Sequence, residues 1–354
     1  MNVKKILSLA ASTIKLFIII LLFISDSKAE ETNIKYYYND KGILSLMYHR
    51  FDEDKYPSTN IQMDVFKKQI EIIKKFKYNF YDPKNLENNF KNEKKEKKIL
   101  ITIDDAFSSF YAIAWPYLKK EKIPFILFVS TETVGKNGYM TWDQIKKLEK
   151  ETIAYIGNHS HSHNYLVDLK NDDFISDIDI SSTIFKKNLG YNPIFFSYPF
   201  GEYSSLIKEY ISKNFKFSFG QHSGVIDVNK DPHELPRFPI NEKYGDLKRF
   251  EFLIKLNPLQ YKLLNPLDKY ITNNNPPNFL VEFFDEQKNI YNINCFSDEG
   301  NKWEKSDISF NQNTLKLNFR EKFNFRRGRI NCSLNDDGIW RWFGIQFSVE
   351  QKLN

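Results

Sequence analysis

Two short segments of the chain combine residue types that bind divalent metal ions. Ile101-Thr-Ile-Asp-Asp105 ends an apolar run with two carboxylates, and Ile156-Gly-Asn-His-Ser-His-Ser-His163 ends another run with imidazoles. A hydrolytic metal centre needs two or three deprotonated ligands from rigid elements, and it leaves one coordination position open for water. The two segments therefore indicate a metal-dependent hydrolase.

The spacing of these residues suggests which of them bind the metal and which accepts a proton. His159 and His163 are four positions apart, so one helical turn after a strand would place both on one face. His161 would then point elsewhere and serve as a structural residue, although an extended conformation would put all three histidines together. Asp104 and Asp105 are adjacent and must point in different directions. We expect one of them to bind the metal and the other to accept a proton.

These residues resemble the signature motifs of the polysaccharide deacetylase family, also called the NodB-homology domain or carbohydrate esterase family 4. The family motif Thr-x-Asp-Asp corresponds to Thr102-Ile-Asp104-Asp105, and its histidine motif corresponds to His159-Ser-His-Ser-His163. The family motif Arg-x-Pro-Tyr/Phe-Gly corresponds to Ser197-Tyr-Pro199-Phe200-Gly201, with a serine in place of the arginine. The late Leu-x-His motif of the family is missing after Gly201. The likeness covers roughly residues 43–250.

The resemblance implies a role for each matching residue. Asp105, His159 and His163 would bind Zn²⁺ or another divalent transition metal, and Asp104 would be the general base. The backbone N–H of Phe200 would hold the oxyanion. A wall of the substrate groove would be formed by Tyr198, Pro199 and Phe200. The implied activity is the removal of acetyl groups from an N-acetylated polysaccharide or cell-wall glycan.

Three residues outside these motifs are candidates for the missing catalytic groups. His49 ends the first apolar run, and family members with a rearranged motif order carry a comparable early Tyr-His pair. We expect His49 to be the general acid, with support of the site as its alternative role and His222 as the competing acid. Arg237 could replace the motif arginine by pairing with Asp104 and lowering the pKa of that carboxyl group. A surface ion pair is the alternative for Arg237.

Apolar runs of strand length alternate with longer amphipathic stretches from Ile43 onward, which is typical of βα units around a parallel sheet. Almost every run ends in polar residues, and β/α barrels build their active sites at the carboxyl ends of their strands. We therefore predict an α/β fold, a distorted (β/α)7 barrel, which the family resemblance also implies. The predicted strands are 43–48, 99–103, 124–130, 153–156, 194–197, 215–219 and 235–238, and predicted outer helices include 63–75, 107–120 and 175–189.

The pattern changes after the barrel. We predict a catalytic domain over 40–255, a linker over 256–277 and a β-rich accessory domain over 278–354 that forms a small antiparallel sandwich. Cys295 and Cys332 are the only cysteines, and an oxidising compartment would join them, with two buried thiols as the alternative. Trp340 and Trp342 are favoured as core residues, with stacking on sugar rings as the alternative.

The N-terminus predicts export. Residues 1–29 combine early lysines, a short apolar run and Ser27-Lys-Ala29 as a cleavage site, which is typical of a secretory signal peptide. An uncleaved membrane anchor is the alternative, but the apolar run is short for a bilayer span. We therefore expect a periplasmic or extracellular protein that meets the membrane only through its export signal. Its oligomeric state cannot be read from the sequence.

Composition narrows the function classes. The 354 residues and 41% apolar content suffice for two domains. The net charge of +6 is spread over lysine-rich stretches with interleaved acids, so it indicates a solvated surface and argues against nucleic-acid binding. Two functional alternatives stay open: a deacylase of O-acetyl esters or small amides on the same fold, and a catalytically weak glycan-binding or export-accessory protein.

Overall fold

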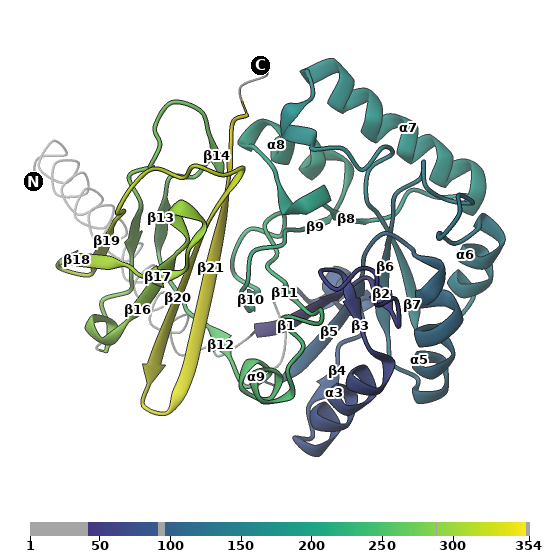
Figure 1. Ribbon diagram of the computed structural model, residues 1–354, viewed down its shortest axis with the longest axis horizontal. Coiled ribbons are helices and arrows are strands. Elements are labelled where there is room, and N and C mark those ends of the chain that lie inside the picture. The colour runs from purple at the N-terminus through teal and green to yellow at the C-terminus, as the bar shows by residue number, and fades with distance from the viewer. Residues whose placement is uncertain (1–41, 91–95, 288, 352–354) are drawn as a thin grey trace, which may run out of the picture.

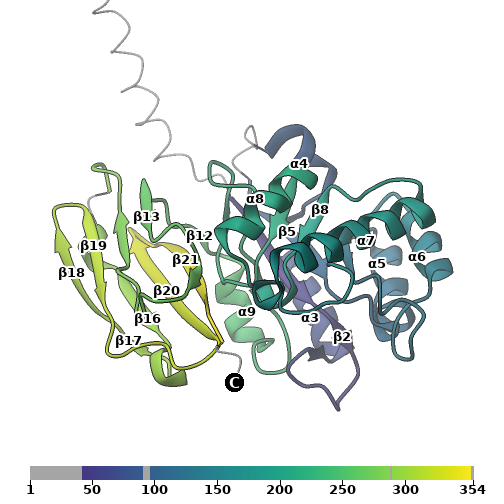
Figure 2. The same ribbon diagram turned by 90° about the horizontal axis from the view of Figure 1, so that it is seen from above.

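The computed structural model describes residues 42–90, 96–287 and 289–351, which form two domains lying side by side (Figures 1 and 2). The predicted signal peptide lies outside the described residues. Within the described ranges, no helix is long and apolar enough to cross a membrane.

The larger domain is built on a sheet whose strands run in the order β10-β1-β5-β6-β7-β8-β9. Neighbouring strands from β1 to β9 are parallel, and β10 is an antiparallel addition to β1. The bounds are β1 Gly42–Tyr48, β4 Asn79–Phe80, β5 Lys98–Ile103, β6 Phe125–Val129, β7 Ala154–Asn158, β8 Phe195–Ser197, β9 Phe217–Phe219, β10 Ile226–Asp227 and β11 Phe238–Pro239. A two-stranded sheet, β2 Arg50–Phe51 and β3 Asn60–Ile61, follows β1.

The segment around β11 links the two ends of this sheet. Leu235 makes a parallel bridge to Phe219 of β9, and β11 pairs in parallel with β1 through Leu46 and Phe238. The sheet therefore curls back on itself, and the carboxyl ends of its parallel strands lie at the same end of the barrel. All seven predicted runs contribute to this sheet, and the predicted distorted barrel is confirmed.

Helices cover the outside of the sheet (Figure 1). The longer ones bury an apolar stripe, as in α3, where Phe66, Ile70 and Ile73 are buried at helical spacing. Helix α6 begins with a capping box between Thr141 and Gln144. The helices are α3 Met63–Lys75, α4 Lys84–Asn89, the π-helix Phe110–Ala114 continued by α5 Trp115–Glu121, α6 Trp142–Glu149, α7 Asn171–Leu189, α8 Ser205–Asn214 and α9 Leu247–Leu253.

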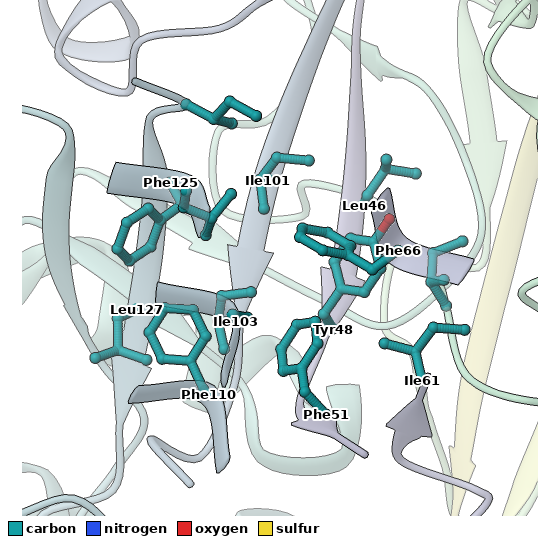
Figure 3. Packing of buried hydrophobic residues seen from close by; sticks show 14 of the residues in the cluster. Leu46, Tyr48, Phe51, Ile61, Phe66, Ile101, Ile103, Phe110, Phe125 and Leu127 are labelled. Atoms are coloured by element: carbon teal, nitrogen blue, oxygen red, sulfur yellow. The ribbon is translucent and has the colours of Figure 1, made fainter. Parts of the chain in front are cut away.

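The main core lies between the sheet and these helices. Side chains of β1, β5 and β6 pack against the first helices and the π-helix, as Figure 3 shows for Tyr48, Phe66, Ile103 and Phe110. The aromatic rings meet edge to face, with a centroid distance of 5.0 Å between Tyr48 and Phe66. This packing fixes the positions of the strand ends, and so it also positions the residues that come directly after β1 and β5.

The smaller domain is a two-sheet β-structure, in agreement with the β-rich prediction. One sheet has the order β12-β21-β20-β16-β17, with β14 also paired to β21, and the other has the order β13-β15-β19-β18. Residues from both sheets form one apolar core. The bounds are β12 Asn257–Pro258, β13 Leu263–Asn265, β14 Tyr270–Ile271, β15 Leu280–Glu282, β16 Asn294–Ser297, β17 Glu304–Lys305, β18 Asp307–Asn311, β19 Thr314–Asn318, β20 Arg327–Asp336 and β21 Ile339–Val349.

The segment 256–277 differs from the predicted linker. It contributes β12 and β14 to one sheet of the smaller domain and β13 to the other. These strands are two or three residues long, too short to show the alternation that identifies a strand in sequence. We therefore propose that the accessory domain begins at β12, directly after α9.

Cys295 and Cys332 form a disulfide bond, as expected from the sequence. The two residues are register partners on β16 and β20, and both are buried in the core of the smaller domain. The bond therefore fastens two neighbouring strands of one sheet.

Candidate metal centre and active-site cavity

Two strand ends of the barrel bring three metal-ligand types together. Asp105 follows β5, and His159 and His163 follow β7. One ligand atom from each lies within 4.8 Å of the others. Asp105 Oδ1 is 3.2 Å from His163 Nε2 and 3.6 Å from His159 Nε2. The arrangement matches the one carboxylate and two imidazoles that a catalytic zinc site uses.

The orientation of His159 fits a metal ligand. Its Nδ1–H donates to the carbonyl oxygen of Ser197 at 2.6 Å, which leaves Nε2 with the lone pair. That Nε2 is buried and has no hydrogen-bond partner among the described residues. Burial lowers the pKa of His159 to about 4, against the opposing charge of Asp104, so the ring is neutral at physiological pH. A divalent cation could bind to this lone pair and to the neighbouring carboxylate at the same time.

The other two ligands are coupled to each other. Burial disfavours the charged forms of both Asp105 and His163, but the hydrogen bond between them and their charges together have the larger effect. The pKa of Asp105 therefore lies below its ordinary value, and the pKa of His163 lies above its ordinary value. Without a cation, a proton on His163 balances the carboxylate. A divalent metal would have to displace this proton, so binding would release it.

Beside the candidate metal ligands lies a fully buried ion pair between Asp104 and Arg237. The guanidinium donates to both carboxylate oxygens, at 2.6 Å to Oδ1 and 2.9 Å to Oδ2. Burial would raise the pKa of Asp104, but the charge and hydrogen bonds of Arg237 prevail and lower it. The carboxylate is therefore ionised, with Oδ2 at 3.9 Å from His159 Nε2.

Arg237 is held by further contacts across the barrel. It donates through Nε to the Gly220 carbonyl, and through its terminal nitrogens to Thr102 Oγ1 and to Ser197 Oγ at 2.8 Å. Ser197 stands at the arginine position of the family motif, and its short side chain accepts a hydrogen bond from a guanidinium that comes from a different segment. Arg237 thus contacts Asp104 in the interior, and not as a surface ion pair.

The histidine segment is a loop, so the predicted helical turn is wrong. Asn158 Oδ1 accepts from the Ser160 N–H, and Ser160 Oγ accepts from the His163 N–H. From α7, the Asp177 carboxylate accepts the N–H groups of His161 and Ser162 at 2.8 and 3.0 Å. These bonds replace the helical ones and still bring the two outer histidines together.

The role of Asp177 was not predicted from the sequence, although its position among the apolar residues of a predicted helix could have indicated it. Phe174, Asp177, Ile178 and Ser181 occupy one buried stripe of α7, and a carboxylate within such a stripe needs a partner. The side chain of His161 lies apart from the three candidate ligands, with Nδ1 at 2.9 Å from Thr131 Oγ1. That contact suits the structural role expected for His161.

Several residues around the site have a left-handed backbone. The φ angles are 72° for Asp105, 66° for Ser160, 55° for His163 and 59° for Phe200. Such conformations cost roughly 1–3 kcal/mol each in residues other than glycine. Their concentration at the ends of β5, β7 and β8 indicates that the surrounding structure maintains them for the geometry of the site.

The predicted groove wall is only partly formed. Tyr198 and Pro199 are buried, and the Tyr198 hydroxyl donates to the His233 carbonyl, so neither residue lines the cavity at the site. Their side chains belong to the packing beneath β8, which the motif alone does not reveal. Phe200 does line the cavity, and its ring contacts His163 and Tyr165 at centroid distances of 4.7 and 4.0 Å.

A cavity of about 760 Å³ opens onto the candidate metal ligands. Asp105, His163 and His49 line it, and so does His222, which also borders a second cavity. Burial lowers the pKa of His222 to about 4, against the charge of Glu234. The cavity has an unexpected feature: its far wall belongs to the smaller domain and to α9.

Comparisons with known proteins show what this chain is similar to. Residues 91–217 match the family model described as polysaccharide deacetylase. The poly-beta-1,6-N-acetyl-D-glucosamine N-deacetylase of Staphylococcus aureus is 25% identical over 247 residues, covering 62% of this chain and 83% of that protein.

Solved structures share the fold. IcaB from Ammonifex degensii gives a TM-score of 0.54 at 24% identity, covering 60% of this chain and 97% of that chain. The Streptococcus pyogenes deacetylase PplD gives 0.53 at 24% identity, covering 58% and 94%. The family model, the curated relative and the shared fold agree with the resemblance seen in the motifs: residues 91–217 match the polysaccharide deacetylase family, and the chain is similar to hydrolases of that family.

Proposed function

We propose that this protein is an exported, metal-dependent deacetylase that removes acetyl groups from the N-acetylated sugars of a polysaccharide or cell-wall glycan. The observation that carries the proposal is the convergence of Asp105, His159 and His163 beside the buried Asp104–Arg237 pair. The N-deacetylase activity in the name of the staphylococcal relative supports the choice of an amide substrate.

Asp105, His159 and His163 would hold Zn²⁺ or another divalent transition metal. When bound, such an ion supplies an activated water and polarises the acetyl carbonyl. The chain's own contribution is to keep His159 neutral and oriented through the Ser197 carbonyl. Phe200 lines the cavity, and its backbone N–H would be the oxyanion donor.

Asp104 would take the proton of the attacking water. Arg237 keeps this carboxylate ionised and fixes both of its oxygens, so the base is positioned before the substrate arrives. His49 is the better candidate for protonating the departing amine, because it lines the same cavity as Asp105 and His163. His222 is a poorer proton donor, since burial keeps it neutral near pH 7.

Export is supported by two observations. The disulfide between Cys295 and Cys332 suits an oxidising compartment. The predicted signal peptide over residues 1–29 would direct the chain there. A periplasmic or extracellular location would also give the enzyme access to a polymeric glycan.

The proposal is tested by measuring acetate released by the mature chain from an N-acetylglucosamine oligomer and from an O-acetylated glycan of similar length. The protein is loaded with Zn²⁺, stripped with a chelator, and reloaded. We expect release from the N-acetylated oligomer to disappear on stripping and to return on reloading. Release from the O-acetylated glycan alone would reassign the enzyme to esters, and release that survives complete stripping would contradict the metal site.

A further inference from the structure

The wall of the cavity opposite the candidate metal ligands is rich in arginine. Arg249 of α9 and Arg327 and Arg329 of β20 line the cavity together with Trp303. In the described part of the chain, Asp105 is the one carboxylate among the lining residues, and the proposed metal would neutralise it. The cavity therefore offers cations to a ligand and no free anion.

Arg249 is the least compensated of the three. It is partly buried, and its guanidinium donates to the Tyr244 carbonyl. The Asp246 carboxylate accepts the Arg249 backbone N–H at 2.9 Å, but among the described residues no carboxylate forms an ion pair with the guanidinium. Burial lowers the pKa of this guanidinium, against the opposing charge effects of Tyr244 and Asp246. A guanidinium that has lost water without gaining an ion pair attracts an anion.

The two arginines of β20 have partners but keep hydrogen-bond donors available. Arg329 binds Asp298 through Nε and its backbone N–H, and Arg327 Nε lies 3.4 Å from Glu202, which also pairs with Arg326. The hydrogen bonds found within the described ranges use no terminal nitrogen of Arg327 or Arg329. These forked donors match the geometry of a carboxylate or phosphate.

An aromatic surface stands next to these donors. Trp303 is 40% exposed, and the guanidinium carbon of Arg329 lies 5.5 Å from the centroid of its ring. An exposed indole face beside a cation suits a sugar ring that carries an acidic substituent.

We propose that α9 and the smaller domain form an anion-recognising subsite of the cavity, and that the substrate is an acidic N-acetylated glycan. The inference rests on the proposed function, since it names the substrate class for that site. It also has a consequence for the product. Deacetylation creates ammonium groups, which the arginines repel, so an extensively deacetylated polymer is a poor ligand for this cavity.

The test compares kcat/KM for acetate release from three N-acetylglucosamine oligomers of equal length: a neutral one, one that alternates with glucuronate, and one joined by phosphodiesters. The zinc-loaded wild type is expected to prefer an acidic oligomer roughly tenfold, as one charge-assisted contact provides. The two acidic arms identify the anion as carboxylate or phosphate. Raising the salt concentration should reduce the preference.

Variants on α9 locate the subsite. Arg249→Gln should lower the acidic-to-neutral ratio roughly tenfold, and Arg249→Lys should retain most of it. The matched control is Lys248→Gln, which removes one positive charge from an exposed neighbour on the same helix and should keep the wild-type ratio. If Arg249→Gln does not fold, the substrate preference of the wild type and its salt dependence still decide the question.

Two results would separate the inference from the function on which it rests. Equal kcat/KM on acidic and neutral oligomers would overturn the inference and leave the deacetylase intact. Binding of the acidic oligomers by the zinc-loaded protein, measured by calorimetry, without acetate release from any oligomer would overturn the deacetylase and support the subsite.

Discussion

At the scale of single residues, an arginine contact to Asp104 at the candidate site comes from a different segment of the chain than the family motif predicts. The motif arginine of the family is replaced by Ser197, while Arg237 reaches Asp104 from the segment before β11. The motif comparison showed that the arginine is missing at position 197, and the position of Arg237 at the end of an apolar run suggested that it replaces this arginine. The bidentate geometry could not be predicted, because it depends on how β8, β9 and β11 meet.

Arg237→Met should be strongly destabilising. It leaves the buried Asp104 carboxylate without its partner, and breaking a buried ion pair from one side costs about 3–5 kcal/mol in the free energy of unfolding. Urea unfolding measures the loss. The control is Lys213→Met, which breaks an exposed pair with Glu209 and should leave the free energy of unfolding almost unchanged. Similar stabilities for the two variants would mean that the Asp104–Arg237 pair is not buried in solution.

At the scale of elements, the histidine loop depends on a carboxylate of α7. Asp177→Asn removes the negative charge that accepts the N–H groups of His161 and Ser162, and it leaves all three candidate ligands in place. We expect zinc affinity to fall roughly tenfold, as happens when groups that orient ligands are changed. Competition with a chromogenic chelator measures this affinity. Asp173→Asn, at an exposed position of the same helix, should leave it unchanged.

Elements with a strong periodic signal could be predicted from sequence. The apolar spacing of residues 63–75 gave the bounds of α3, and each of the seven runs became part of the large sheet. The histidine loop and the strands of residues 257–271 could not be predicted in the same way. Their conformations come from side-chain hydrogen bonds and from pairing with distant strands, and both are tertiary effects.

At the scale of the whole molecule, the smaller domain lines the cavity of the candidate site. The predicted β-rich domain was recognised from its alternating runs, but its contribution to the cavity follows from its contact with the barrel. Glu202 of the barrel, Arg326 and Arg327 join the two domains in an ion-pair network that also includes Asp168. The carboxyl group of Glu202 gives this network a pH dependence.

Burial raises the pKa of Glu202 to about 7, although Arg327 and Arg326 oppose the shift. The stability contribution of this group is therefore fully present below its unfolded pKa, about 4.3, and is lost as the pH rises through about 7. Glu202→Gln stays neutral, so its Tm should equal the wild-type value near pH 4 and exceed it by several degrees at pH 8. Thermal unfolding at both pH values tests this. A Tm difference that does not change with pH would refute the shift.

The disulfide should stabilise the smaller domain without affecting the metal centre. Cys295 and Cys332 are 37 positions apart, and a loop of this size contributes about 3–4 kcal/mol in the chain-entropy model. Cys295→Ser combined with Cys332→Ser should lower the free energy of unfolding of that domain by this amount. Zinc stoichiometry should stay the same, and its loss would show that the two domains fold as one unit.

Asp104 is proposed as the base of a metal-dependent deacetylase, and acetate release by zinc-loaded Asp104→Asn decides this role when zinc content is determined on the same sample. We expect wild-type zinc content and a kcat lower by at least a hundredfold, since a positioned general base contributes about 10²–10⁴ in rate. If the variant binds zinc and releases acetate at the wild-type rate, Asp104 is not the base.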